Sequence, residues 1–458
     1  MDTELEKGKA VAQNTFGHQP RRSASARRGR RPAPSPEGSV AVDALLELTD
    51  DRFSCINKEF RSIKDPRDAS RILYSAPTLL WTLLLGFIGR CGSRNAMDGT
   101  RNEGHYAQTV LAFSKQRAWP DGEPLTTACT ETACSFLDHI APEILEGLLV
   151  TLVRQLIRAK ALDWARVFGY FMIAVDGTKQ ENCRAGYSVD GKSMRMVLEA
   201  KLIGPNGLAL PILVEPLDQY DNEREKHDCE QRAFKRIAPR LKEAFPKLLI
   251  CLSGDALYAS EPVFEICERY NWKFMLTFKD GSHPAVAQEA QALLKLQKEN
   301  MHTIEEEGSQ IYLRWVQAVP FPNQDLQVVF CKQTGENSYT GAWVTNFLVE
   351  DAETAATVAQ GSRRRWNIES SFNVQKHGGF GLEHTFCTSD KRAANMHLLM
   401  QLAHLVWQIV YLGILRRVFA KCRKLSQITI ALLIRQAMHA IGARKTPDKR
   451  YQLRFSSA

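Results

Sequence analysis

The chain has 458 residues, of which 44% are hydrophobic and 24% charged, and its net charge is +9. This composition is ordinary for a soluble globular protein, and the length allows two or three domains with sizeable cores. The eleven cysteines include no CxxC pair, and no His/Cys cluster surrounds the closest two, Cys129 and Cys134, which argues against a structural zinc site. Free thiols in a reducing compartment are the simplest account.

The first 40 residues are strongly basic. The stretch RRSASARRGRR (21–31) has six arginines among eleven residues, and PAPSPEG (32–38) follows it. Because such a stretch cannot bury apolar surface, we predict a disordered basic arm over residues 1–40 that suits nucleic acid or an acidic surface. A transit peptide is the alternative, but Glu4, Glu6 and the lack of an amphipathic pattern argue against it.

Residues 41–165 read as helical. The segment PEILEGLLVTLVRQLIRAK (142–160) has a proline at its start and apolar pairs at helical spacing. Two apolar stretches, 72–89 and 396–415, approach the length of a membrane span. The first is interrupted by polar residues, and the second carries polar residues every three or four positions. We therefore predict buried core helices and no membrane partner.

From residue 166 onward, strands alternate with helices. Apolar runs that read as strands stand at 167–176, 194–203, 208–217, 247–255 and 273–278, with amphipathic helices at 230–245 and 261–271. This pattern predicts an α/β fold, α+β overall, whose first part occupies residues 166–280.

The second half of the chain interrupts that pattern. Residues 300–348 read as strands without helices between them, so we predict a β insertion over 281–350. The core then resumes over 351–415 with helical residues, and a basic helical region over 416–458 closes the chain.

Two acids follow buried strands. Asp176 ends the first predicted strand and Asp255 ends the fourth. Functional groups of α/β sheets gather at the carboxyl ends of strands, and an unpaired carboxylate directly after an apolar run is costly to bury. Either residue alone could instead be a loop or helix-capping aspartate.

A third acid, Glu369, lies in the basic segment RRRWNIESSFNVQK (363–376). One interpretation is an i,i+4 ion pair between Arg365 and Glu369 on a helix. The other is that Glu369 holds a metal ion beside a polyanion. In that case the cations of the segment would bind backbone phosphates; they are Arg363, Arg364, Arg365 and Lys376.

Three carboxylates without a His or Cys ligand set suit Mg²⁺ or Mn²⁺ rather than zinc. Two such ions can activate a water or a 3′-hydroxyl and stabilise the leaving oxygen of a phosphodiester. We therefore expect Asp176, Asp255 and Glu369 to be both the catalytic residues and the metal ligands, with two ions per active site.

Three blocks of the sequence resemble those of DDE transposases from bacterial insertion sequences: AVDGT (174–178), GDALYAS (254–260) and RWNIESSF (365–372). The resemblance is to the group with a Y-x2-R-x3-E-x6-K signature, and it covers roughly residues 165–415. Arg365, Glu369 and Lys376 match that spacing, whereas Ser362 stands where the group has tyrosine.

This resemblance implies an RNase H-like mixed sheet flanked by helices, with an inserted β subdomain and an N-terminal helical DNA-binding region over 41–165. It also implies Mg²⁺-dependent cleavage at transposon ends and strand transfer into target DNA. The implied partners are the terminal inverted repeats, target DNA and a second copy of the chain in a synaptic complex. The implied location is the bacterial cytoplasm, on the nucleoid when bound to DNA.

Two other functions compete with this one. GYSVDGKS (186–193) matches the P-loop pattern of nucleotide-binding ATPases, which needs a strand before its first glycine and a helix that opens at Lys192. Polar residues precede the motif and a strand-like run follows it, so a turn that enters a hairpin is the better interpretation. A catalytically inactive, DNA-binding relative is the second alternative.

Residues around Glu369 leave further questions open. We predict that Trp366 and Phe372 pack the helix of Glu369 onto the sheet, with base stacking as the lesser alternative. The glycines of HGGFGLEH (377–384) predict a tight loop, in which Glu383 and His384 serve either the loop or the site.

Overall fold

The computed structural model describes residues 36–458 apart from several gaps, which are 117–125, 182–186, 190–191, 218–222, 282–283, 307, 322–323, 336–337, 388, 421–424 and 441–458 except 453 and 455. Most of the predicted basic arm, 1–35, therefore lies outside the described residues. Its last five residues begin the first helix, α1 (Pro36–Asp51). Proline suits this position because its missing N–H would have no partner in the first turn.

The part of the chain before the sheet is helical where it is described. Helix α3 (Ala76–Ile88) is buried along its whole length, so the apolar stretch at 72–89 forms a core helix as predicted. The other helices are α2 (Ser54–Ser62), α4 (Arg94–Asp98), α5 (Gly104–Ser114), α6 (Thr130–Phe136) and α7 (Pro142–Arg158).

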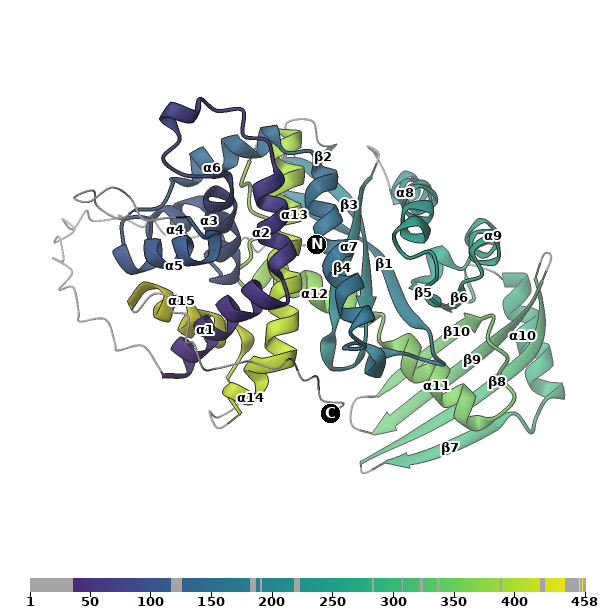
Figure 1. Cartoon of the computed structure of the whole chain (residues 1–458). Coiled ribbons are helices and arrows are strands. Elements are labelled where there is room, and N and C mark those ends of the chain that lie inside the picture. The colour runs from purple at the N-terminus through teal and green to yellow at the C-terminus, as the bar shows by residue number, and fades with distance from the viewer. Residues whose placement is uncertain are drawn as a thin grey trace, which may run out of the picture. The chain divides into compact units, whose positions relative to one another are not determined.

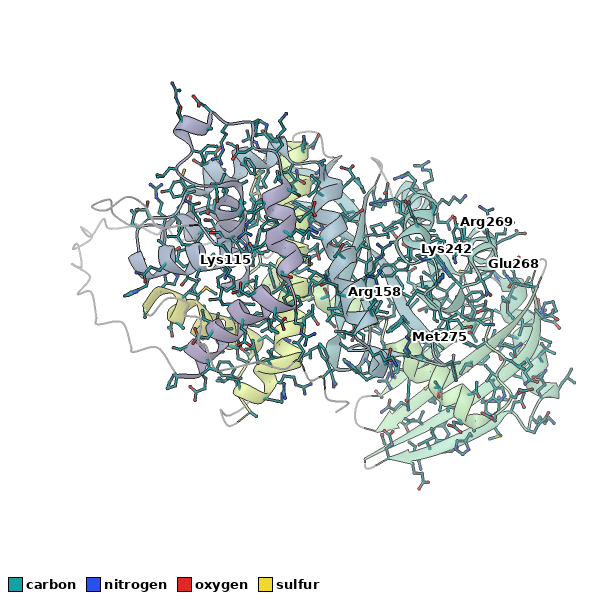
Figure 2. All side chains as sticks on the ribbon, in the orientation of Figure 1. Lys115, Arg158, Lys242, Glu268, Arg269 and Met275 are labelled. Atoms are coloured by element: carbon teal, nitrogen blue, oxygen red, sulfur yellow. The ribbon has the colours of Figure 1, made fainter. Side chains whose placement is uncertain are left out.

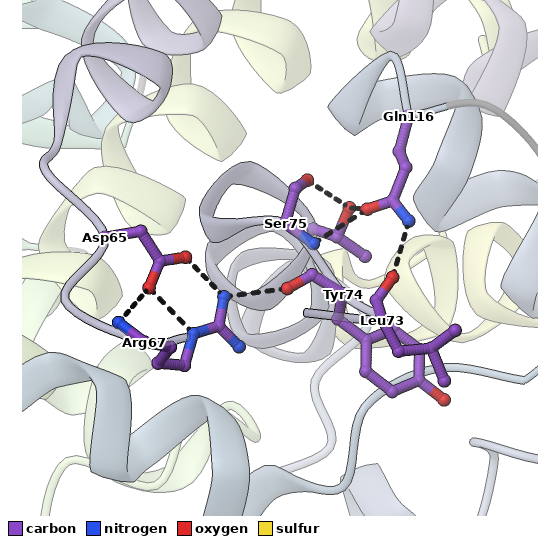
Figure 3. Close-up of polar contacts among 7 residues, drawn as sticks. Asp65, Arg67, Leu73, Tyr74, Ser75 and Gln116 are labelled. Carbon is purple, nitrogen blue, oxygen red and sulfur yellow. Dashed lines mark hydrogen bonds and ion pairs between the residues drawn. The ribbon is translucent and has the colours of Figure 1, made fainter. Parts of the chain in front are cut away.

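Polar contacts position the start of α3 (Figure 3). Arg67 pairs with Asp65 at 2.6 Å and donates a hydrogen bond to the carbonyl of Tyr74 at 2.8 Å. The side chain of Gln116 accepts from the backbone N–H of Ser75, the residue before the helix, at 2.9 Å. Since chain ends of a helix carry polar backbone groups without intrahelical partners, these contacts allow α3 to begin inside the core.

One mixed sheet organises the rest of the chain. Its strand order is β2-β3-β1-β5-β6-β10-β9-β8-β7, and β4 also pairs with β3. The strands are β1 (Phe171–Glu181), β2 (Tyr187–Val189), β3 (Lys192–Ile203), β4 (Ala209–Pro216), β5 (Ile250–Gly254), β6 (Lys273–Thr277), β7 (Met301–Glu306), β8 (Ser309–Phe321), β9 (Gln324–Gly335) and β10 (Tyr339–Thr345).

The five strands β4-β3-β1-β5-β6 form the core sheet, which the resemblance implies to be RNase H-like. β1, β3 and β4 are antiparallel neighbours, whereas β5 and β6 run parallel to β1. The NG dipeptide at 206–207 joins β3 to β4, and both Asn206 and Gly207 have positive φ angles, as hairpin turns of this kind require.

The P-loop alternative is wrong. Val189 of β2 pairs with Lys192 of β3 in an antiparallel hairpin. Lys192 therefore opens a strand and not a helix, so no helix N-terminus is available there for phosphate. The predicted hairpin is confirmed by the pairing of its two strands.

The predicted β insertion extends the core sheet. β10 pairs antiparallel with β6 on one side and with β9 on the other, so backbone hydrogen bonds run continuously from the core into β7–β9 (Figure 1). The sequence pattern missed β7, whose side chains are mostly exposed, and helix α10 (Pro284–Leu296). A strand that is open to solvent carries little apolar signal, which explains the first omission.

Helices pack on both faces of the core. α8 (Glu223–Ala244) contacts β3 and β4 and lies beside α9 (Glu261–Tyr270). α12 (Trp366–His377) contacts β1, β3 and β4, and α13 (Asp390–Val410) contacts β4 as well as α3 and α7. α11 (Ala352–Arg363) packs closely on β6: a Cβ at Gly361 would lie 3.2 Å from the Sδ of Met275, which Figure 2 labels.

Helix α13 and its continuation form the second predicted core helix. Within the described residues, the stretch Asp390–Val418 is long and apolar enough to cross a membrane, yet 94% of its most apolar window is buried inside the structure. The short helix α14 (Arg416–Val418) ends it, and α15 (Gln427–Ala440) follows and contacts α1 and α5.

Candidate active site

Asp176 and Asp255 lie side by side on neighbouring strands. β1 and β5 pair in parallel as far as Ala174, which stands opposite Ser253. Each aspartate follows two residues later along its own chain, so the same register places them next to each other, at the strand spacing of about 4.8 Å. Both carboxylates are only partly buried. The structure therefore brings these two predicted site residues together.

The prediction that Asp176 ends its strand was wrong. β1 continues to Glu181, because β3 pairs with it as far as that residue. β5, however, stops at Gly254, so Asp176 has a neighbouring strand on one side only. On the other side, the chain leaves the sheet at Asp255, directly after the end of β5. The Oδ1 of Asp255 accepts a hydrogen bond from the N–H of Leu257 at 2.9 Å. Asp255 thus also has the capping role that its sequence left open.

Glu369 reaches this edge of the sheet from the first turn of α12. Apolar and amide side chains on the neighbouring face of the helix hold it against the sheet, and Ile368, Phe372 and Gln375 are all buried. The Glu369 side chain keeps 32% of its surface exposed. A half-exposed acid on a helix that is otherwise anchored in the core remains accessible to a ligand.

Electrostatics link these carboxylates. The pKa of Asp176 is raised to about 7, first by burial and then by the negative charges of Glu369 and Asp255. Arg365 lowers it, and a further carboxylate, Glu230, raises it. Like charges act this way only at short range, so the three predicted acids lie near one another.

The four predicted phosphate-binding cations have different surroundings. Arg365 pairs with Glu369 at 2.6 Å, so the helix ion pair that the sequence left as the alternative does form. Lys376, two turns farther along α12, pairs with Glu383 at 3.0 Å. Arg363 and Arg364 point elsewhere, because Arg363 donates to Gln333 at 2.9 Å and Arg364 donates to the carbonyl of Ala165 at 3.4 Å.

The two aromatic residues of α12 differ. Phe372 is buried as predicted, but Trp366 is 51% exposed, so the prediction that it packs on the sheet was wrong. The Arg365 guanidinium lies over the Trp366 ring, 5.0 Å from its centroid. Trp366 occupies the first position of the helix. Ser362, where the resembled group has tyrosine, is buried.

A buried polar network connects α12 to the sheet. Lys201 on β3 is fully buried, pairs with Glu199 at 2.9 Å and donates to Ser371 on α12 at 2.8 Å. On α13, His397 and Gln401 contact Glu199 at 2.9 Å and 3.0 Å. The network therefore connects the sheet to the helix of Glu369 and to the long core helix behind it.

The sequence patterns missed these residues and two more. Glu230 stood at the first position of a predicted amphipathic helix, and Tyr258 stood in the GDALYAS block without a role. Glu230 and Tyr258 are both buried near Asp176. For Glu199 and Lys201 the signal was two charged residues in an apolar strand, LEAKLI (198–203). Charged residues are almost never fully buried unless they are paired, which is the clue that could have found them.

The three predicted acids have the right chemistry for hard divalent cations, but they are not close enough together to hold one. Asp176, Asp255 and Glu369 offer carboxylate oxygens, which Mg²⁺ and Mn²⁺ prefer. Their mutual repulsion, visible in the raised pKa of Asp176, is what a bound cation would relieve. Within the part of the chain that the structure describes, no three such side chains are grouped closely enough to hold an ion. The ion pair to Arg365 engages one Glu369 oxygen.

Comparison with known proteins gives one family match, to the second half of the chain. Residues 224–406 match the family model described as Transposase DDE domain, a range that includes Asp255 and Glu369. No curated protein matches the chain. Solved structures with some likeness include a piggyBac transposase synaptic complex with hairpin DNA, at 10% identity and a TM-score of 0.35, over 88% of this chain and 81% of that chain. The NurA nuclease from Sulfolobus solfataricus is similar at 10% identity and a TM-score of 0.25, over 49% of this chain and 86% of that chain. Residues 224–406 of the chain are therefore similar to the DDE domain of transposases.

Proposed function

We propose that this chain is a DNA transposase that cleaves DNA at the ends of its element and joins those ends to target DNA, with Asp176, Asp255 and Glu369 as the metal ligands. The observation that carries the proposal is the parallel register of β1 and β5, which puts Asp176 beside Asp255, with Glu369 near enough to raise the pKa of Asp176. Two Mg²⁺ or Mn²⁺ ions, when bound, would activate the attacking water or 3′-hydroxyl and neutralise the leaving oxygen.

The chain's own residues would prepare the site for DNA. Arg365 neutralises Glu369 through their 2.6 Å ion pair when no ligand is present. A phosphate that approaches α12 competes for the guanidinium, because bidentate pairing with phosphate is among the strongest hydrogen-bonding interactions of arginine. Release of Arg365 then frees both oxygens of Glu369. Lys376, held by Glu383, would bind the next phosphates along the backbone.

The partners follow from this chemistry. The ends of the element and target DNA are the substrates, and we propose a homodimer as the synaptic assembly, working in the bacterial cytoplasm on the nucleoid. Trp366, with 51% of its surface exposed one turn before Glu369, offers a face on which a base can stack. The N-terminal helices are proposed to bind the terminal repeats, and the basic arm to bind phosphates without sequence preference.

The test is isosteric removal of each charge. Asp176→Asn, Asp255→Asn and Glu369→Gln should each reduce cleavage of an end-containing DNA by several orders of magnitude, while end binding persists. Asp325→Asn, which removes the charge of an exposed carboxylate on β9, is the matched control and should cleave like wild type. Wild-type cleavage by Glu369→Gln would show that the ion pair to Arg365 is its whole role.

The same cleavage assay distinguishes an active transposase from the remaining alternative, an inactive DNA-binding relative. An inactive DNA-binding relative would bind element ends without any metal-dependent nicking, whatever the substitution. If the wild-type protein cleaves the end-containing DNA in Mg²⁺ and EDTA abolishes this cleavage, that alternative is excluded.

A further inference from the structure

Arg90, just after the end of α3, is a buried cation without a polar partner. Its side chain is 5% exposed, and none of its three guanidinium nitrogens has a hydrogen-bond partner within the described part of the chain. Burial lowers the pKa of Arg90 to about 9, which leaves the guanidinium charged at neutral pH. Because arginine is almost never fully buried unless it is paired, this position needs an explanation.

The backbone at Arg90 is also unfavourable for arginine. The N–H of Arg90 donates to the carbonyl of Phe87 at 3.0 Å, and the N–H of Cys91 donates to the carbonyl of Gly86 at 3.0 Å. These two bonds end α3 in a Schellman motif, in which the residue at the position of Arg90 is usually glycine. Arg90 takes the left-handed conformation there, with φ of 58°. Both burial and backbone disfavour arginine here, and such exceptions to local rules are expected at functional positions.

Two aromatic rings compensate the buried charge. The guanidinium carbon of Arg90 lies 3.6 Å from the ring centroid of Phe380 and 4.7 Å from that of Trp407. Phe380 follows the end of α12, Trp407 is on α13, and both are buried. The attraction between a cation and an aromatic face is strongest where both are removed from water. The stack therefore joins the end of α3 to the loop after α12 and to the long core helix.

The backbones of these segments also approach closely. A Cβ on Gly381 would lie 2.4 Å from the carbonyl oxygen of Gly92, and a Cβ on Gly379 would lie 2.8 Å from the Cβ of Arg90. Gly379 and Gly381 have φ angles of 85° and 78°, which side chains rarely allow. The glycines of the predicted tight loop thus let residues 378–382 lie directly against the turn that contains Arg90.

The same loop holds the last turn of α12. The N–H of Leu382 donates to the carbonyl of Gln375 at 3.0 Å, and Glu383 pairs with Lys376 at 3.0 Å. α12 has 12 residues, with Glu369 in its first turn. A continuous hydrogen-bonded helix of this length moves as one body, so the anchor at its last turn also sets the position of Glu369.

We propose that Arg90 is a positioning residue of the active site: its guanidinium, held between Phe380 and Trp407, fixes the loop after α12 and so the helix that carries Glu369. This inference rests on the proposed function above. Arg90 acts through α12 and touches none of the three predicted acids. The helical region before the sheet, and not the sheet alone, then sets the place of a proposed metal ligand.

The test compares Arg90→Met and Arg90→Lys with wild type in the full-length protein. Methionine removes the charge and keeps a long side chain between the rings, so Arg90→Met should melt no lower than wild type, because an unpaired buried charge is gone. Its cleavage rate at saturating end-containing DNA in Mg²⁺ should nevertheless fall about 10- to 100-fold, as a displacement of about 1 Å can cause. DNA affinity in EDTA should change less than this rate.

Two further variants show whether the charge is responsible. Arg90→Lys keeps a cation beside the rings and should cleave faster than Arg90→Met. Arg154→Met is the matched control, because Arg154 on α7 lies over another ring, that of Phe245, at 5.7 Å from its centroid. Arg154→Met should cleave like wild type.

A second measurement needs no DNA. Amide hydrogen exchange over residues 366–384, measured by mass spectrometry in EDTA, should be faster in Arg90→Met than in wild type, since α12 loses an anchor. Wild-type cleavage or wild-type exchange in Arg90→Met overturns this inference, as do equal cleavage rates in Arg90→Met and Arg90→Lys. Absence of Mg²⁺-dependent cleavage by the wild-type protein overturns the proposed function instead, and faster exchange in Arg90→Met would then still show that Arg90 holds α12.

Discussion

Asp176 and Glu199 stand opposite each other in the sheet but have different surroundings. In the antiparallel register of β1 and β3, Asp176 pairs with Glu199. Glu199 is fully buried and meets Lys201 at 2.9 Å and His397 at 2.9 Å. Asp176 is partly buried and its neighbours include Asp255, Glu369 and Glu230.

The difference appears in their pKa values. Burial acts to raise the pKa of Glu199, but Lys201 and His397 outweigh it, so the pKa is lowered. Burial raises the pKa of Asp176 to about 7, and Arg365 only partly opposes the repulsion of the other acids. The structural carboxylate Glu199 is thus neutralised by cations of the chain itself, whereas Asp176, the proposed metal ligand, keeps a repulsion that a cation from outside would relieve.

The largest expected difference is in the free energy of unfolding, between a variant that changes the surroundings of Glu199 and a variant that changes Asp176. Lys201→Met should lower the free energy of unfolding by about 3–5 kcal/mol, because it leaves the buried Glu199 without its main cation. Asp176→Asn should lose no stability and gain a little, since it removes a repelled charge. Urea denaturation measures both.

Lys179→Met, an exposed lysine on the neighbouring strand, is the control and should change stability by less than about 0.5 kcal/mol. If Lys201→Met lowered the free energy of unfolding by less than about 1 kcal/mol, the buried Glu199 would not depend on Lys201, and the contrast between Glu199 and Asp176 would be wrong.

The pH dependence of stability sharpens the comparison. The folded pKa of Asp176 is about 7, above its ordinary 3.8, so the folded state binds the proton more tightly than the unfolded state. Its contribution is therefore fully present below pH 3.8 and is lost as the pH rises to about 7. In EDTA, the melting temperature of wild type should fall across this window relative to Asp176→Asn.

Mg²⁺ should reverse that trend near neutral pH, since it favours the charged carboxylate. Melting curves of the two proteins at pH 4 to 8, with EDTA or with Mg²⁺, are the measurement. Parallel curves for wild type and Asp176→Asn in EDTA would contradict the expectation.

The smallest stability effect concerns the ion pair between Arg365 and Glu369. Arg365→Ala should cost only a few tenths of a kcal/mol, about 0.2–0.5, as i,i+4 pairs do. If Arg365 grips a phosphate, the slope of log affinity against log salt for DNA should flatten by about one unit. Filter binding at several salt concentrations provides the slope, and an unchanged slope would assign Arg365 to the helix alone.

The sequence by itself determined the identity of the three predicted acids, the DDE resemblance and most of the core strands. These features are local: an apolar run followed by an acid, or a signature of fixed spacing on one helix, is visible without knowing what packs against it. The same is true of the β2–β3 hairpin, whose flanking residues were enough to disfavour a P-loop.

Only the tertiary structure decided what surrounds those acids. The register of β1 against β5 sets Asp176 beside Asp255, and the pairing of β10 with β6 makes the insertion part of the core sheet. Glu230 meets Gly177 through a helix packed on the far face, across a separation of 53 residues along the chain. Such contacts depend on how elements pack, and neither periodicity nor spacing within one segment carries that information.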